Sequence, residues 1–115
     1  MSLPGLDRWY RFIKSHDRAE LAGLRTAFGD GLAKVPLAPI KAQIGNLAAG
    51  SGADAAAAVL ALHAGKIPPA VNTRKTIDGQ KLNVSPEARD AKLDVSISSV
   101  YSLGGQNAAL VFKRV

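Results

Sequence analysis

The sequence predicts an α/β domain in which helices and one short strand precede a buried helix and a C-terminal strand pair. Three patterns indicate this fold class. Apolar residues recur at helical spacing near the N-terminus, residues 53–64 read "ADAAAAVLALHA", and apolar and polar residues alternate after residue 92. With 115 residues, the chain has the size of a single domain.

Two amphipathic helices are expected at the N-terminus. The apolar face of the first consists of Leu6, Trp9, Tyr10 and Ile13. This first helix either packs into the core or docks on a partner. Asp17 and Glu20 have the spacing of a capping box, so a second helix is expected to begin there. Its end is expected near Gly29 or Gly31.

A short strand and a glycine-rich strip follow the helices. Pro36 and Pro39 each lack an amide donor, which limits residues 35–38 to an edge strand or an irregular one. The strip "IGNLAAGSG" then precedes the next helix, and its Asn46 or Ser51 is a candidate N-cap. The chain is therefore expected to turn tightly just before residue 53.

The alanine-rich segment predicts a helix that is buried on opposite sides. Only Asp54 and His63 are polar between residues 53 and 64, and alanine has the highest helix propensity. A helix that is apolar all round is normally covered all round, here by a sheet or a companion subunit. Gly65 is expected to end it. Since so short a chain cannot easily enclose such a helix, we expect a dimer or a larger protein.

The C-terminal segment predicts a β-hairpin. Apolar Leu93, Val95 and Ile97 alternate with polar side chains, the pattern of a half-buried strand. Gly104–Gly105 separates this strand from a second one within residues 107–115. The polar segment before them is expected to be a loop, with a turn at Asp78–Gly79 and one helical turn from Ser85.

Composition excludes several functional classes. The chain has no cysteine, so it has no disulfide, thiolate metal site or thiol nucleophile. No metal or cofactor is expected. No apolar run reaches the roughly 18 residues of a membrane helix, and the N-terminus does not resemble a secretory signal, so we expect a cytoplasmic protein. The net charge of +6 favours acidic partners. Nucleic acid is not expected, because the basic residues are not interleaved with aromatic ones.

Two stretches resemble the C-terminal end of the β-ketoacyl-acyl carrier protein synthases. They are "APIKAQIGNLAAGSGADAAAAVLALHAGKIPPAVN" and "SLGGQNAALVFKR". The family pattern is a lysine, four residues, a histidine, a small-residue helix and Gly-x-x-Pro-Pro, followed by a Gly-Phe-Gly-Gly-Thr-Asn loop between two strands. The resemblance implies the C-terminal half of a thiolase-like fold, with a mixed sheet, a buried small-residue helix and a C-terminal antiparallel strand pair. Residues 1–115 would be one partial domain, with residues 1–16 as an N-terminal helix outside the family.

The resemblance also assigns candidate site residues. Lys41 matches the catalytic lysine, and Asn46 stands at the position of the second catalytic histidine. Leu103, Gly104 and Gly105 match the substrate-binding loop, with Leu103 in place of the gatekeeping phenylalanine. Without the resemblance, these residues read as a solvated lysine, a helix cap and an ordinary hairpin turn. The nucleophilic cysteine and the first catalytic histidine of the family have no counterpart in this chain.

Three functions remain open at this point. The first is a C-terminal part of an acyltransferase that elongates fatty acids or polyketides by decarboxylative Claisen condensation and is not competent alone. Its partners would be acyl carrier protein and either an N-terminal half or a second copy. The second is a non-catalytic partner akin to a chain-length factor, which the loss of histidine at Asn46 favours. The third is a small interaction protein derived from the fold. The basic residues that either remain solvated or dock the acidic carrier are Arg74, Lys75, Lys81, Lys113 and Arg114.

Overall fold

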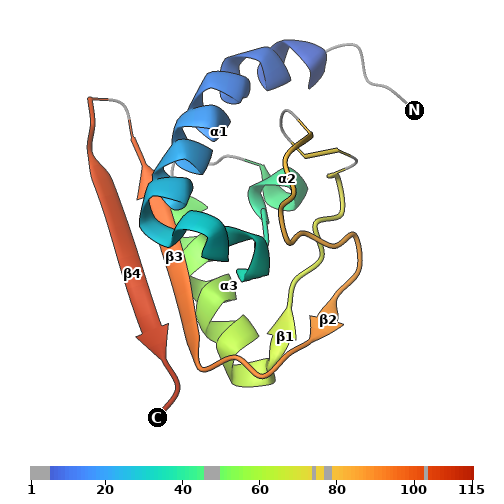
Figure 1. Cartoon of the computed structure of the whole chain (residues 1–115), viewed down its shortest axis with the longest axis vertical. Helices are drawn as coiled ribbons and strands as arrows, with labels where there is room; N and C mark the ends of the chain where they lie inside the picture. Colours follow the sequence, from blue (N-terminus) through green and yellow to red (C-terminus); the bar gives the residue numbers. More distant parts are fainter. Residues whose placement is uncertain (1–5, 46–49, 74, 77–78, 103) are drawn as a thin grey trace. The chain divides into compact units, whose positions relative to one another are not determined.

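A computed structural model describes residues 6–45, 50–73, 75–76, 79–102 and 104–115, and the side chains from Ser15 onward within those ranges. The chain forms two compact units, residues 1–37 with 75–83 and residues 38–74 with 84–115. The elements, shown in Figure 1, are α1 (Leu6–Phe28), η1 (Gly29–Lys34), α2 (Lys41–Ile44), α3 (Gly50–Ala64), β1 (Lys66–Ile67), β2 (Arg89–Asp90), β3 (Val95–Tyr101) and β4 (Asn107–Lys113).

The first unit contains one long helix where two were predicted. α1 runs without a break through Asp17, because neither glycine nor proline separates Leu6 from Ala22. Desolvation raises the pKa of Asp17, and the neighbouring His16 opposes that rise. Asp17 lies inside α1 and therefore does not cap its N-terminus. The predicted apolar face of residues 6–13 lies outside the described side chains.

The end of α1 and the segment behind it agree better with the sequence. α1 ends at Phe28, and Gly29 begins the 3-10 helix η1 with a φ of 54°, as the glycine predicted. Leu32 is buried. The expected short strand is reduced to one parallel bridge between Pro36 and Asn83, supported by the Leu37 amide, 2.9 Å from the Asn83 carbonyl oxygen.

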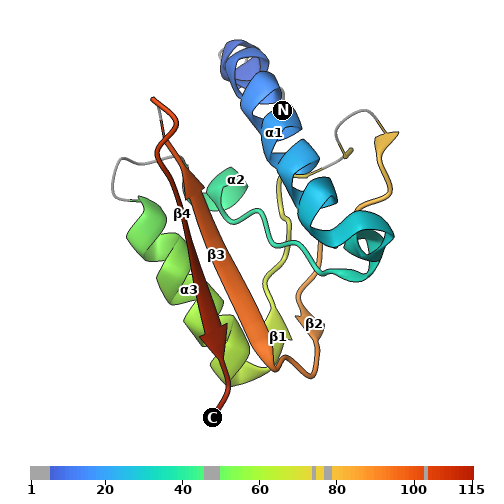
Figure 2. The same cartoon turned by 60° about the vertical axis from the view of Figure 1, so that its left-hand side comes forward.

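The alanine-rich helix forms in the second unit, but this chain covers only one of its sides. α3 begins at Gly50 rather than at residue 53, so Ser51 lies within the helix and is not its cap. Figures 1 and 2 both place the β3–β4 hairpin along α3, and Leu62 is 6% exposed. Val59 and Leu60 are 43% and 65% exposed. Within the described second unit the β3–β4 hairpin covers one side of α3, which agrees with the expectation that so short a chain cannot enclose this helix.

The predicted C-terminal hairpin is confirmed, with its faces reversed. β3 and β4 are antiparallel, with Val95 opposite Lys113 and Tyr101 opposite Asn107. Ser96 donates a hydrogen bond of 2.9 Å to the carbonyl oxygen of Ala58, so the serine face of β3 lies on α3. Val95 and Ile97 point to the other face and are 48% and 51% exposed. The small serine side chains let the strand approach the helix closely, which alternation alone does not reveal.

A second strand pair was not predicted. β1 and β2 are antiparallel, and Lys66 Nζ lies 2.6 Å from Asp90 Oδ1. The described sheets are these two separate antiparallel pairs, so the predicted mixed sheet is not what this chain forms. The predicted helical turn from Ser85 is instead a bend, in which the Glu87 amide donates to the Ser85 hydroxyl at 3.2 Å.

Candidate functional site

Lys41 is held in an ion pair at the start of a single helical turn. The Nζ atom of Lys41 lies 3.1 Å from Oδ2 of Asp54, and their side chains are 38% and 12% exposed. Lys41 is the first residue of α2, and Asp54 lies near the N-terminus of α3. The pair therefore fixes the ammonium group of Lys41 beside the alanine-rich helix.

Two side-chain hydrogen bonds fasten α2 to the segment that follows β1. Asn72 Nδ2 donates to the carbonyl oxygen of Ala42 at 2.6 Å, and Gln43 Nε2 donates to the carbonyl oxygen of Pro69. An isolated turn of four residues is not stable in water, because nucleating a helix costs more than one hydrogen bond returns. The position of Lys41 is consequently set by contacts outside α2.

The predicted substrate-binding loop forms the turn of the β3–β4 hairpin. Gly104 and Gly105 have φ values of 83° and 79°, which explains the choice of glycine at both positions. The Ser102 amide donates to the carbonyl oxygen of Gln106 at 2.8 Å and closes the turn. A Cβ atom added at either glycine would meet no other atom within 4 Å, so this turn is open.

The structure does not bring all predicted site residues together. Asn46 and Leu103 lie outside the described residues. Among the residues that are described, no hydrogen bond or ion pair joins Lys41 to Gly104 or Gly105. The catalytic assignment of Lys41 and Asn46 and the substrate-binding assignment of Leu103, Gly104 and Gly105 therefore remain predictions.

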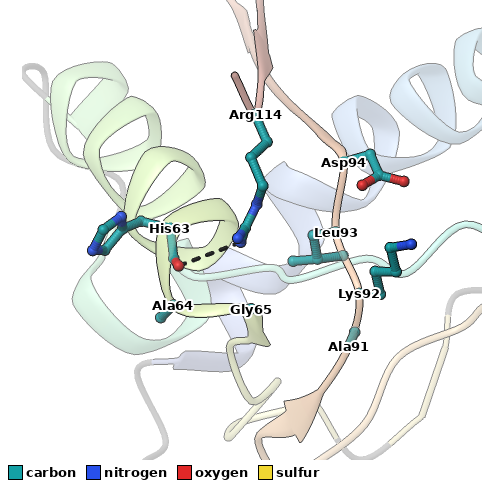
Figure 3. A pocket seen from close by; sticks show the side chains of 8 residues that line it. All are labelled: His63, Ala64, Gly65, Ala91, Lys92, Leu93, Asp94 and Arg114. Carbon is teal, nitrogen blue, oxygen red and sulfur yellow. Dashed lines mark hydrogen bonds between the residues drawn. The ribbon is translucent and has the colours of Figure 1, made fainter.

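A cavity of about 250 Å³ lies at the end of α3, and Arg114 is one of the residues that line it. Arg114 donates to the carbonyl oxygen of Leu62 and, at 3.3 Å, to that of His63. Figure 3 shows the imidazole of His63 and the carboxylate of Asp94 pointing away from Arg114 on opposite sides. The guanidinium thus caps the last carbonyls of the helix, where a positive charge is favourable.

The basic residues are divided between the two units. Lys75 and Lys81 are exposed in the first unit, Lys113 and Arg114 are exposed in the second, and Arg74 lies outside the described residues. The described part of the chain contains no group of three or more side chains suited to a metal ion. Within that part, no helix has both the length and the hydropathy needed to cross a bilayer.

Three residues that hold Lys41 or its helical turn in place were not predicted from the sequence. Asp54 carries the only acidic side chain of α3, and a lone charge in an otherwise apolar helix was a signal that it has a partner. Asn72 follows directly after the "IPPAV" stretch and stood out in no pattern. Gln43 belongs to a helical turn that was not predicted.

Comparison with known proteins places these residues in a family. The sequence model described as "Beta-ketoacyl synthase, C-terminal domain" matches residues 13–74, which include α2 and α3. Nodulation protein E of Rhizobium meliloti is 31% identical over 104 residues, 89% of this chain and 26% of that protein. 3-Oxoacyl-[acyl-carrier-protein] synthase 2 of Coxiella burnetii is 32% identical over 101 residues, 86% of this chain and 24% of that protein. An actinorhodin polyketide putative beta-ketoacyl synthase 1 of Streptomyces coelicolor is 33% identical over 102 residues, 87% of this chain and 22% of that protein.

The chain spans about a quarter of the length of these relatives. The family match extends over the whole of α3, although Val59 and Leu60 are exposed. The match over residues 13–74, together with the three relatives, shows that this chain belongs to the β-ketoacyl synthase family and corresponds to its C-terminal portion.

Proposed function

We propose that this chain forms the lysine-bearing part of a condensing enzyme that elongates fatty acids or polyketides by decarboxylative Claisen condensation. The observation that carries the proposal is the Lys41–Asp54 ion pair, 3.1 Å long, inside the segment that matches the family. In this proposal the two units belong to the C-terminal half of a thiolase-like fold, as one partial domain. The site is a cytoplasmic one.

The chemistry divides between this chain and another polypeptide segment. In the condensation, a malonyl thioester loses carbon dioxide, and the resulting carbanion attacks an acyl group held as a cysteine thioester, with release of the thiolate. This chain has no cysteine, so two copies of it still supply no nucleophile. The thiol must come from a segment outside this chain. Lys41 contributes a fixed cationic donor that stabilises developing negative charge near the reacting carbonyl.

Two partners are proposed, because the lysine and the nucleophilic thiol lie on different polypeptide segments. We propose acyl carrier protein as the substrate carrier, because the carrier is acidic and the net charge here is +6. A polypeptide that supplies the cysteine-bearing half is the second partner. Homodimerisation would cover apolar surface but would not complete the chemistry.

The test is affinity purification of the tagged chain from its source cell, followed by a condensation assay. We expect recovery of a cysteine-containing synthase segment or an acyl carrier protein, and formation of 3-oxoacyl thioester by the recovered complex. Lys41→Met should lower product formation by about a hundredfold, the lower end of the loss seen when one preorganised donor is removed. Lys66→Met is the matched control, because Lys66 is also ion-paired, at 2.6 Å from Asp90. Recovery of neither partner, or equal activity of both variants, contradicts the proposal.

A non-catalytic, chain-length-factor-like role is the second candidate, and Asn46 favours it. An amide donates a hydrogen bond but does not titrate near neutral pH, whereas imidazole does. Asn46→His in the recovered complex distinguishes the two. If the site is catalytic, the substitution should raise decarboxylation of malonyl thioester. If this subunit only supports its partner, the rate should not change. A homodimer that binds neither partner would instead indicate a small interaction protein.

A further inference from the structure

We propose that Asn72 is a positioning residue for Lys41: its side chain and that of Gln43 form a clasp that holds α2 where the Lys41–Asp54 pair can form. The Asn72 amide donates to the Ala42 carbonyl at 2.6 Å, and Gln43 donates in the opposite direction, from α2 to the Pro69 carbonyl. The inference rests on the proposed function for the chemical role of Lys41, but not for its geometry.

The helical turn needs such a clasp because it has little stability of its own. The turn is closed by the Ile44 amide, 3.2 Å from the Ile40 carbonyl oxygen, and the Gly45 amide, 2.9 Å from the Lys41 carbonyl oxygen. Ile44 is 47% exposed, so apolar burial holds the turn only weakly. The Ala42 and Gln43 amides add two more backbone bonds, to the carbonyl oxygens of Pro39 at 3.2 Å and Ile40 at 2.9 Å. The two clasp bonds therefore add half as many hydrogen bonds again to those that fix the turn.

The segment that receives the clasp is well anchored. Ile67 and Ala70, on either side of Pro68–Pro69, are 7% and 1% exposed. The Ala70 amide donates to the Ser85 carbonyl at 2.7 Å, and the Thr73 amide donates to the Ala70 carbonyl at 3.1 Å. Two consecutive prolines further restrict the backbone. The clasp thus ties an exposed single turn to one of the most buried parts of the second unit.

The ion pair depends on the same placement. Lys41 and Ala42 are adjacent in α2, so the bond from Asn72 fixes the backbone next to the lysine. If the clasp opens, α2 frays, and the lysine side chain gains rotamer freedom that opposes its pairing with Asp54. The amide of Asn72 acts on the site through the backbone of Ala42 and makes no contact with a reacting group.

Chemical reactivity of Lys41 tests this positioning in the intact chain. Trace acylation with acetic anhydride, followed by peptide mass spectrometry, reports the reactivity of each lysine separately. We expect Asn72→Ala to raise the acylation rate of Lys41 about twofold to fivefold, the factor that corresponds to losing a partly exposed ion pair. Lys66, paired with Asp90 at 2.6 Å, is the internal reference and should not change.

Two further variants separate positioning from general loss of structure. Asn83→Ala removes a similar bond, from Asn83 Nδ2 to the Lys34 carbonyl at 3.2 Å in the first unit, and should leave Lys41 unchanged. Gln43→Ala removes the other half of the clasp from an exposed position and should reproduce the effect of Asn72→Ala even if the latter folds poorly. The double variant should fall short of the product of the two single effects, because both bonds hold the same turn.

The acylation rates decide whether the clasp positions Lys41, and they do not depend on catalytic activity. Unchanged Lys41 reactivity in folded Asn72→Ala or Gln43→Ala overturns the inference, as does a parallel rise at Lys66, which would indicate general opening. A selective rise at Lys41 supports it. Because acylation needs neither carrier protein nor cysteine partner, a failed condensation assay alongside a selective rise would overturn the proposed function while leaving the clasp intact.

Discussion

Replacing Gly65 with alanine tests how α3 is joined to the strand pair that follows it. Gly65 comes directly after the last residue of α3 and has a φ of 65°, a conformation that residues with a side chain rarely adopt. A Cβ atom at this position would lie 3.3 Å from the carbonyl oxygen of Ala91, and the Ala91 amide donates to the Gly65 carbonyl at 2.9 Å. The added methyl group would therefore strain the backbone and push against the segment after β2.

The expected loss has two parts. A left-handed conformation costs a non-glycine residue about 1–2 kcal/mol, partly offset by about 0.4–1 kcal/mol because alanine restricts the unfolded chain. The close contact with Ala91 adds a cost, because that oxygen belongs to a hydrogen-bonded backbone and cannot move freely. We expect Gly65→Ala to lower the free energy of unfolding by about 1–2 kcal/mol.

Urea denaturation followed by circular dichroism measures this loss, and Gly29→Ala is its matched control. Gly29 also follows a helix directly and has a φ of 54°, but a Cβ atom there would meet nothing within 4 Å. Gly29→Ala should therefore show the conformational cost without the contact. If Gly65→Ala loses no more stability than Gly29→Ala, the reasoning from the Ala91 contact is refuted.

Two other substitutions test the hairpin and α1. Ser96→Val should lower the free energy of unfolding by about 1–3 kcal/mol, because it removes the hydrogen bond to Ala58 and adds volume against α3. Ser99→Val is the control, because Ser99 lies on the outer face of β3 and its replacement should not lower the free energy of unfolding. Equal losses for the two variants in urea denaturation would contradict the assigned faces. The pKa of Asp17 is raised above 3.8 in the folded chain, so folding binds a proton, and stability should fall as pH rises through the interval between the unfolded and folded pKa values. Urea midpoints measured from acid to neutral pH report this decline in stability, and Asp17→Asn should remove it. If the variant shows the same pH dependence as the unchanged chain, the raised pKa of Asp17 is contradicted.

The sequence predicted those elements whose ends are set by local chemistry. Gly65 marked the end of α3, and Gly104–Gly105 marked the hairpin turn, because positive φ is a property of the glycine itself. The capping-box spacing at Asp17 led to a wrong prediction, because the absence of glycine and proline before it lets the preceding helix continue through this position. Element type was thus more predictable than element boundaries.

The strand faces and the side-chain partners that are distant in sequence could not be predicted, because both depend on packing. The alternation in β3 identified a two-faced strand, but only the bond between Ser96 and Ala58 shows which face meets α3. Lys41 was singled out by resemblance, whereas its partner Asp54 could be found only once α2 and α3 were placed. The clasp residue Asn72 is separated from Ala42 by 30 positions, a distance over which spacing carries no information.

The outward face of the hairpin has a consequence for how the chain behaves in solution. Val111 is 66% exposed and Tyr101 49% exposed on that face, and electrostatic repulsion from the net charge of +6 keeps such faces of different molecules apart. Added electrolyte shortens the reach of this repulsion to about 8 Å at physiological ionic strength and less above it. We therefore expect the chain to stay dispersed in dilute buffer and to associate as the salt concentration rises.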